Sequence, residues 1–302
     1  MKLKNLALLS CLIILVIFVF SIGKKKASAQ LGNLEITRNI QYAIRENTNS
    51  NLTSLDIYAP NNAKNSPVMI MIHGGGWRNG DKQNRGLNAN KIPFFSQNNF
   101  IYISINYRLS PAVQHPGHIE DVAEAVSWIH DNIGKYGGDK SKIFVMGHSA
   151  GAHLAALVAT DERRLQKHKK NLSVIKGVIL LDGAGYDIPT QMKGFSFFGG
   201  LLQDMYENAF TTDENLQKDA SPYYHIAKGK NIPPFLIFTA GGRIASVNQS
   251  TKMVEAMQKA GIQAETIDDG AKNHGTINSQ FGLTDEMITK KSKEFLDGIL
   301  RK

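Results

Sequence analysis

Hydrophobic residues in this chain follow two spacings, and segments of the two kinds alternate along the sequence. Short runs that are apolar throughout, or apolar at every second residue, predict strands, whereas apolar residues three or four apart predict helices. The predicted strands cover residues 36–43, 55–58, 68–72, 100–108, 142–146, 174–181, 234–240 and 263–267. The predicted helices cover residues 119–136, 247–260 and 284–300, with one more after Gly151. This alternation predicts an α/β fold, with a mostly parallel sheet covered by helices on both faces and only the first two strands antiparallel.

One stretch in the second half of the chain, residues 183–232, fits neither spacing well. We expect it to form a cap or lid on a single domain that spans residues 30–302. Its aromatic side chains either line a substrate pocket or pack the cap onto the sheet, and both roles stay open. These aromatic residues are Phe195, Phe197, Phe198, Tyr206, Phe210, Tyr223 and Tyr224.

The N-terminus has the pattern of a secretory signal peptide. Two lysines precede an apolar run over residues 6–22, and the small-residue sequence Ala27-Ser28-Ala29 follows it. This arrangement predicts cleavage after Ala29 and export to the periplasm or the medium. An uncleaved N-terminal membrane anchor is the alternative, because the apolar run is just long enough to span a bilayer.

The charge of the chain is concentrated in that leader. The whole sequence has a formal net charge of +9, but residues 1–29 hold five lysines and no acidic residue, which leaves 30 Lys and Arg against 26 Asp and Glu. A balance of +4 does not indicate a nucleic-acid-binding protein. Cys11 is the single cysteine, so a chain cleaved after Ala29 has no disulfide, thiol nucleophile or thiolate metal site.

The segment KIFVMGHSAGAHLAA, residues 142–156, predicts a strand, a sharp turn and a helix. A serine at such a turn adopts an unfavourable backbone conformation, and side chains two residues away on either side would collide with the strand and the helix. Glycine at Gly147 and Gly151 removes that collision. The turn lifts the hydroxyl of Ser149 above the sheet, so Ser149 is the candidate nucleophile. A small-residue turn without chemistry is the alternative.

A second glycine-rich turn, His73-Gly74-Gly75-Gly76, follows the predicted strand 68–72. Its backbone N–H groups have no side chains that would block an approaching oxygen, which is what an oxyanion hole requires. Gly75 and Gly76, together with the N–H of Ala150, are therefore the candidate oxyanion hole. A phosphate-binding loop is the alternative, but the Lys-Ser/Thr pair of a P-loop does not follow the glycines.

A serine nucleophile needs a base, and His274 is the candidate among nine histidines. It lies in the loop after the last predicted strand, where the order serine then histidine places an imidazole over the serine. His148 and His153 flank the nucleophile and are expected to point into the turn or along the helix. Five further histidines are expected to be loop or surface residues: His115, His118, His130, His168 and His225.

From about residue 36 to its end the chain resembles the α/β-hydrolase superfamily, and within it the hormone-sensitive-lipase-like and feruloyl-esterase-like carboxylesterases. The motifs that carry this resemblance are HGGGW at 73–77, NYRLSP at 106–111, D-x-x-x-A-x-x-W-I at 121–129, GHSAG at 147–151, SPYYH at 221–225 and NHG at 273–275. The resemblance implies the α/β-hydrolase fold and acyl hydrolysis without a metal or organic cofactor. It says much less about the substrate.

The chain departs from this family at the third member of the triad. The resemblance implies an acid in the loop after strand 234–240, near Gly242, but no carboxylate occurs there before Glu255. Asp182, at the end of the preceding predicted strand, is the candidate replacement, and Asp187 is a weaker one. Asp268 and Asp269 are too close to His274 in sequence to fold back onto its far nitrogen. Without any acid the site would be a dyad, at a cost of about 10⁴ in turnover.

These observations predict an exported serine esterase that forms an acyl-enzyme on Ser149, with His274 as the base and Asp182 as the acid. By resemblance its substrates are small aryl or short-chain esters. One alternative is a catalytically impaired hydrolase fold that binds a ligand. The other is an arylformamidase-like amidase, but the predicted signal peptide disfavours the cytoplasmic metabolic role of such an enzyme. No nucleic-acid partner is expected, nor a membrane after cleavage, and the oligomeric state is not predicted.

Overall fold

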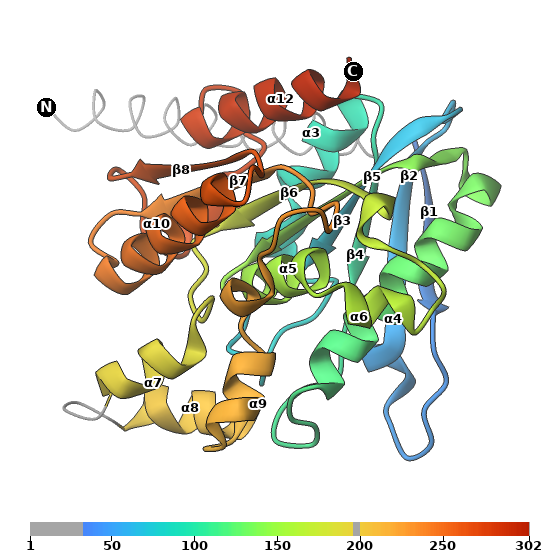
Figure 1. Cartoon of the computed structure of the whole chain (residues 1–302). Coiled ribbons are helices and arrows are strands. Elements are labelled where there is room, and N and C mark those ends of the chain that lie inside the picture. Colours follow the sequence, from blue (N-terminus) through green and yellow to red (C-terminus); the bar gives the residue numbers. More distant parts are fainter. Residues whose placement is uncertain (1–32, 196–199, 302) are drawn as a thin grey trace, which may run out of the picture.

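The computed structural model describes residues 33–195 and 200–301, which form one eight-stranded sheet with helices on both faces (Figure 1). The strand order is β1-β2-β4-β3-β5-β6-β7-β8; β1, β2 and β4 pair antiparallel, and all other neighbours pair parallel. The predicted fold class is therefore confirmed. The strands are β1 (Leu34–Gln41), β2 (Ser54–Pro60), β3 (Ser66–Ile72), β4 (Ile101–Ile105), β5 (Gly138–His148), β6 (Ile175–Leu181), β7 (Phe235–Ala240) and β8 (Ala264–Asp269).

Strand β5 shows why the central strands are apolar throughout. Ile143 and Val145 belong to the core on one face of the sheet, and Phe144 and Met146 to the core on the other face. All four side chains are fully buried. Because neighbouring residues of a strand point to opposite faces, a strand covered on both sides needs an apolar residue at every position.

Five helices supply those two covers. The core on one face takes in apolar residues of α4 (Gly117–Asn132), α5 (Ala150–Thr160) and α10 (Ile244–Lys259). The core on the other face takes in α3 (Lys91–Gln97) and α12 (Met287–Leu300), which lie at the top of Figure 1. The predicted helices 119–136, 247–260 and 284–300 correspond to α4, α10 and α12, and the first of them continues as the 3₁₀ turn η2 (Ile133–Tyr136).

Several short elements were not predicted, since a helix of one or two turns is too short to show an apolar period. They are α2 (Arg85–Asn88), α3, α6 (Glu162–Gln166), α11 (Thr276–Ser279) and the 3₁₀ turns η1 (Ser50–Thr53) and η3 (Leu172–Val174). The predicted strand 100–108 was too long. β4 ends at Ile105, and the next residue, Asn106, is buried and accepts a hydrogen bond from the Lys82 backbone N–H at 2.6 Å.

The cap is helical, contrary to the prediction that residues 183–232 fit no period. It contains α7 (Ile188–Phe195), α8 (Leu201–Phe210), α9 (Glu214–Asp219) and the 3₁₀ turn η4 (Pro222–His225), and lies at the bottom of Figure 1. In α8 the residues Met205, Tyr206, Ala209 and Phe210 turn inward at a spacing of four. That spacing was visible in the sequence, but the exposed Leu201 and Leu202 obscured it.

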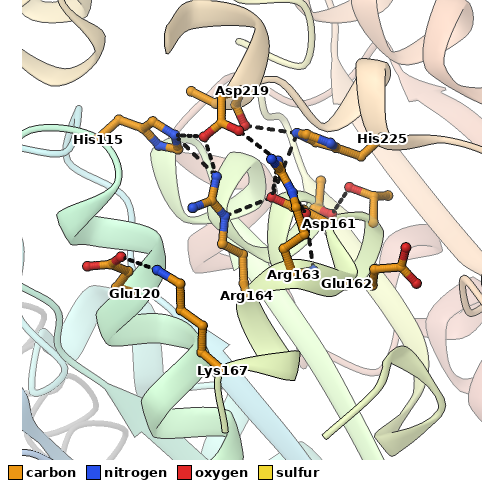
Figure 2. A network of polar contacts seen from close by, with 12 residues as sticks. His115, Glu120, Asp161, Glu162, Arg163, Arg164, Lys167, Asp219 and His225 are labelled. Atoms are coloured by element: carbon orange, nitrogen blue, oxygen red, sulfur yellow. Dashed lines mark hydrogen bonds and ion pairs between the residues drawn. The ribbon is translucent and has the colours of Figure 1, made fainter. Parts of the chain in front are cut away.

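A cluster of ion pairs ties the end of the cap to the body of the protein (Figure 2). Asp219, the last residue of α9, is contacted by His115, Arg163 and Arg164, and both arginines also contact Asp161 at the start of α6. We call these five residues the Asp219 cluster. Oxygen and nitrogen atoms of Asp161, Asp219 and His225 lie within 4.8 Å of one another. Two guanidinium groups already neutralise these carboxylates, so the geometry favours an ion-pair network over a metal site.

The predicted signal peptide, residues 1–29, lies outside the described residues, as do Phe197 and Phe198. Within the described ranges, each helix is too short or too polar to cross a lipid bilayer.

Candidate active site

The turn between β5 and α5 holds Ser149 in the conformation that the sequence predicts. Ser149 has φ +56° and ψ −122°, a combination that L-residues rarely adopt. Its backbone N–H donates to the carbonyl of Leu181 at 3.0 Å, which fixes the turn to the end of β6. The surrounding sheet and helix hold Ser149 in this unfavourable backbone conformation. The turn thereby places the serine hydroxyl at the carboxyl edge of the strands.

The two glycines around Ser149 are required by space. A Cβ atom on Gly147 would lie 2.1 Å from the carbonyl oxygen of Gly151. A Cβ atom on Gly151 would lie 2.1 Å from the carbonyl oxygen of Ile72 in β3. Both contacts are with backbone, which cannot swing aside, so any larger residue would push α5 away from the sheet.

His274 and Asp182 stand beside the serine in the order of a triad. The Nε2 atom of His274 lies 3.0 Å from Ser149 Oγ, and its Nδ1 atom lies 2.6 Å from Asp182 Oδ2. A carboxylate only accepts hydrogen bonds, so Nδ1 carries the proton and Nε2 is left to accept from the serine hydroxyl. The structure thus brings together the three predicted residues from the loops that follow β5, β6 and β8.

The carboxylate of Asp182 is fully buried and multiply bonded. Burial alone would raise its pKa, but hydrogen bonds from His274 and Ser246, the charge of Arg243 and the N–H of Ala240 outweigh burial and lower the pKa below its usual range. Its Oδ1 accepts from the Ala240 N–H at 3.2 Å. Asp182 therefore stays ionised at neutral pH and can stabilise a protonated His274.

The other carboxylates that the sequence raised do not reach His274. Asp187 contacts Lys252 and accepts from the Thr190 hydroxyl at 2.8 Å. Asp268 accepts from the Thr239 hydroxyl at 2.7 Å, and Asp269 from the Ala271 N–H at 3.3 Å. The loop after β7, where the resemblance implied an acid, places Gly242 at φ +79°. The side chain that this loop sends to the site is Arg243, whose Nε lies 3.0 Å from Asp182 Oδ2.

The loop after β3 passes directly over the nucleophile. A Cβ atom on Gly74 would lie 3.0 Å from Ser149 Cβ, and Gly75 and Gly76 have φ values of +115° and +62°. The carbonyl of Gly75 accepts from the N–H groups of Arg78 and Asn79, which closes the turn. Among the described residues no acceptor faces the N–H of Gly75 or Gly76, and Ala150 begins a helix whose first N–H groups lack intrahelical acceptors.

A cavity of about 640 Å³ opens beside this loop. Gly74, Gly75 and His148 line it, together with Asn273 and Gly275 on either side of His274 in sequence. Its lining includes His148, the neighbour of Ser149 in sequence, but neither Ser149 nor His274, so it is a cavity beside the triad with room for a small molecule.

Two flanking histidines are structural supports. His148 donates from Nε2 to the carbonyl of His274 at 2.8 Å, which holds the loop that carries the imidazole. His153 donates from Nε2 to the Ala220 carbonyl at 2.8 Å and accepts at Nδ1 from the Trp77 indole at 3.3 Å. Burial lowers the pKa of each to about 3, so both are neutral at pH 7.

The expectation that the five further histidines lie in loops or at the surface was wrong for His118, which is a buried residue of α4, whereas His115 does lie in a loop but is buried there. His115 and His118 are buried, with 6% and 1% of their surface exposed. His115 contacts Asp219, and His118 contacts the Ser110 hydroxyl at 3.0 Å. A buried histidine needs polar partners, and here the cap and the cap-facing loop supply them, which sequence position alone does not reveal.

The aromatic residues of the cap pack mainly against the glycine loop. The Trp77 ring, 2% exposed, contacts the rings of Tyr206 and Phe210 at centroid distances of 5.0 and 4.7 Å. Phe195 contacts Tyr206 at 5.3 Å, whereas Tyr224 is 44% exposed. Met205 was not among the predicted site residues, yet a Cβ atom on Gly76 would lie 2.3 Å from its sulfur. Met205 is therefore the cap side chain that meets the predicted oxyanion hole.

Solved structures of similar fold include esterases. Esterase B from Lactobacillus rhamnosis superimposes with a TM-score of 0.71 over 96% of this chain and 96% of that one, at 18% identity. At that identity the likeness establishes a shared α/β-hydrolase fold.

The esterase LipC of Mycobacterium tuberculosis is 28% identical over 65% of this chain and 49% of its own length. The kynurenine formamidase of Meyerozyma guilliermondii is 26% identical over 77% of this chain and 87% of its own length. Other esterase relatives are likewise matched over only 46–61% of their length. The family model BD-FAE matches residues 55–257, more than half of the chain. This protein therefore belongs to the BD-FAE family, within the α/β-hydrolase fold.

Proposed function

We propose that this protein is a serine hydrolase of carboxylic esters that works through an acyl-enzyme. One observation carries the proposal: Asp182, His274 and Ser149 form a continuous chain of contacts of 2.6 and 3.0 Å at a strained turn above the sheet. A nucleophile and its base must lie within hydrogen-bond distance, with the base oriented by a third group, and these three residues meet that requirement.

In the proposed reaction, Ser149 Oγ attacks the ester carbonyl carbon while its proton passes to His274 Nε2. The carbonyl oxygen becomes an oxyanion that accepts hydrogen bonds from Gly75, Gly76 and Ala150. The C–O bond then breaks, and His274 returns the proton to the departing alcohol. A water molecule, deprotonated by His274, attacks the acyl-enzyme in the second half and releases the acid.

Small aryl or short-chain esters are the proposed substrates. The cavity beside the glycine loop is about 640 Å³, which suits a small ligand. Met205 of the cap lies against Gly76, and the Trp77 ring packs against Tyr206 of α8. The cap therefore limits the space above the scissile bond.

The geometry weakens the alternative of an impaired binding protein. That alternative rested on the missing acid after β7, and Asp182 stands at hydrogen-bond distance from His274 instead. An amidase acting on N-aryl formamides is the second candidate, because the kynurenine formamidase relative is matched over 87% of its length. The same residues would serve it, with an amine in place of the alcohol. Equal turnover of formanilide and phenyl acetate would favour the amidase.

The test is hydrolysis of p-nitrophenyl acetate by the chain that starts at Gln30. Ser149→Ala should lower kcat by at least about 10³-fold, and an alkyl phosphonofluoridate should add its mass to Ser149 alone. Ser173→Ala is the matched control, because Ser173 is exposed and precedes β6 at the opposite edge of the sheet. Equal rates for the parent and Ser149→Ala would overturn the proposal.

Export is part of the proposal, with an N-terminal anchor as the alternative. The apolar run 6–22 and Ala27-Ser28-Ala29 support cleavage after Ala29. Mass spectrometry of the protein released from expressing cells should find an N-terminus at Gln30, and an intact N-terminus in the membrane fraction would favour the anchor.

A further inference from the structure

Arg243 occupies an unusual place beside the triad. Its Nε lies 3.0 Å from Asp182 Oδ2, the same oxygen that accepts the hydrogen bond from His274. Contacts of 3.0, 2.6 and 3.0 Å therefore lead from Ser149 Oγ through the imidazole and one carboxylate oxygen to the guanidinium group. The Nε atom is buried, although 39% of the side chain is exposed. The exposed surface of the Arg243 side chain therefore belongs to atoms other than Nε.

Helix capping does not explain the cation at this position. Arg243 is the N-cap residue of the 16-residue helix α10, and its side chain makes no capping hydrogen bond. Positive charge at a helix N-terminus is unfavourable, because the helix dipole is positive there. Asp182 has hydrogen-bond donors in His274 and the Ala240 N–H, whereas Arg243 Nε faces it only as an ion pair, so the carboxylate does not depend on Arg243 alone.

The two terminal amino groups of Arg243 are available to a ligand. Among the described residues, no oxygen atom contacts either terminal amino group of Arg243. Asp187, another carboxylate next to α10, is already paired with Lys252. On the cap side lies Tyr206: burial raises the pKa of its hydroxyl, and the Arg243 charge opposes that increase. Arg243 thus contacts the triad acid and lies close enough to the cap for its charge to act on Tyr206.

We propose that Arg243 is a substrate-binding residue and that the preferred substrates are esters that carry a carboxylate group. A guanidinium offers planar, paired N–H donors that match a carboxylate. The inference rests on the proposed ester hydrolysis and specifies its substrate class. The carboxylate is carried either on the acyl part or on the alcohol part, and each case has its own pair of substrates.

The test compares anionic with neutral esters that are otherwise alike. For the acyl part, the mono-p-nitrophenyl esters of adipic and suberic acid are compared with the p-nitrophenyl alkanoates of equal carbon number. For the alcohol part, 4-acetoxybenzoate is compared with its methyl ester. The measured quantity is the ratio of kcat/KM for the anionic ester to that for the neutral ester. Any effect of Arg243 on the triad itself cancels in this ratio.

Arg243→Gln should lower the ratio about tenfold in at least one pair, chiefly through KM, because a charged hydrogen bond at a half-exposed site is lost. Arg243→Lys, which keeps the charge without the fork, should give an intermediate ratio. Arg301→Gln removes the same charge at the far end of α12 and should leave the ratio unchanged. Raising the salt concentration should reduce the ratio of the parent more than that of Arg243→Gln.

The outcomes separate this inference from the proposed function. An unchanged ratio in both pairs, with turnover that still depends on Ser149, would overturn the inference and leave the esterase intact. Arg243 would then act only on Asp182. A parent without turnover that depends on Ser149 would overturn both.

Discussion

Two groups of side chains in this protein combine aspartate, histidine and arginine, but they are built in different ways. In the triad, His274 uses Nδ1 for Asp182 and keeps Nε2 for Ser149. In the Asp219 cluster, His115 uses Nε2 for Asp219, at 2.7 Å, and Arg164 contacts the same carboxylate. The residue types are shared, so composition does not distinguish a reactive group from a structural one.

The difference lies in what holds each aspartate. Asp182 directly follows the buried strand β6, with φ +45° and a fully buried side chain, so the backbone itself orients its carboxylate. Asp219 ends the short helix α9, is 29% exposed, and is held by the long side chains of two arginines. A rigid backbone favours orientation of a reacting group, whereas flexible side chains favour attachment of one segment to another. We therefore expect the first aspartate to determine rate and the second to determine stability.

Asp182→Asn is the change with the largest expected effect. Asparagine keeps the shape but loses the charge that stabilises protonated His274, and its amide can favour the wrong tautomer. We expect kcat for p-nitrophenyl acetate to fall by roughly 10³ to 10⁴-fold with little change in KM. The measurement is steady-state kinetics of the purified variant, with circular dichroism to verify the fold. A loss smaller than about tenfold would mean that Asp182 is not the working acid.

Asp219→Asn is the matched variant from the other cluster. It should leave kcat within about threefold of the parent and lower the free energy of unfolding by about 1–2 kcal/mol, because two arginines lose a charged acceptor. Loss of rate in this variant without loss of stability would contradict the distinction between the two clusters.

Acid should reveal a stability cost of the buried histidines. His118, His148 and His153 have pKa values of about 3, lowered first by burial, against about 6.5 in the unfolded chain. Below pH 6.5 the unfolded chain binds protons that the folded chain refuses, so stability falls with pH until about pH 3. Each such histidine should cost about 2 kcal/mol between pH 7 and pH 5.

Urea unfolding at those two pH values measures this cost. His153→Gln retains an amide that can bond Ala220 or Trp77 and should reduce the loss between pH 7 and pH 5 by about 2 kcal/mol. His168→Gln, on the half-exposed turn after α6, is the control. Equal pH dependence of the parent and His153→Gln would show that His153 is not kept neutral by the fold.

The sequence was informative about the site wherever one backbone requirement selects one residue type. Gly147 and Gly151 had to be glycine because their Cβ atoms would meet backbone, and this identified the turn that presents Ser149. Asp182 was harder to assign, since its role depends on β6 lying next to β5 and on a loop nearly a hundred residues away. Strand order within a sheet is a property of the whole fold, so local patterns do not report it.

The cap and its contacts were the part that local patterns predicted least well. Its helices bury one narrow face each and leave large apolar residues such as Leu202 exposed, which weakens the helical period. Met205 and Arg243 became relevant only through their neighbours, Gly76 and Asp182. Residues that act through a partner from another element leave no signal in their own segment.

Gly242→Asp is the change with the smallest expected effect, and it tests whether the site needs an acid after β7. Space does not forbid it: a Cβ atom on Gly242 meets no atom within 4 Å, although φ is +79°. Aspartate tolerates such a φ better than most residues, so we expect a stability loss of at most about 1 kcal/mol. Because Asp182 already holds His274, kcat should stay within about threefold of the parent. A rise of tenfold or more would mean that Asp182, placed by β6 and shared with Arg243, serves the histidine poorly, and that the distinction between the two aspartates is one of degree.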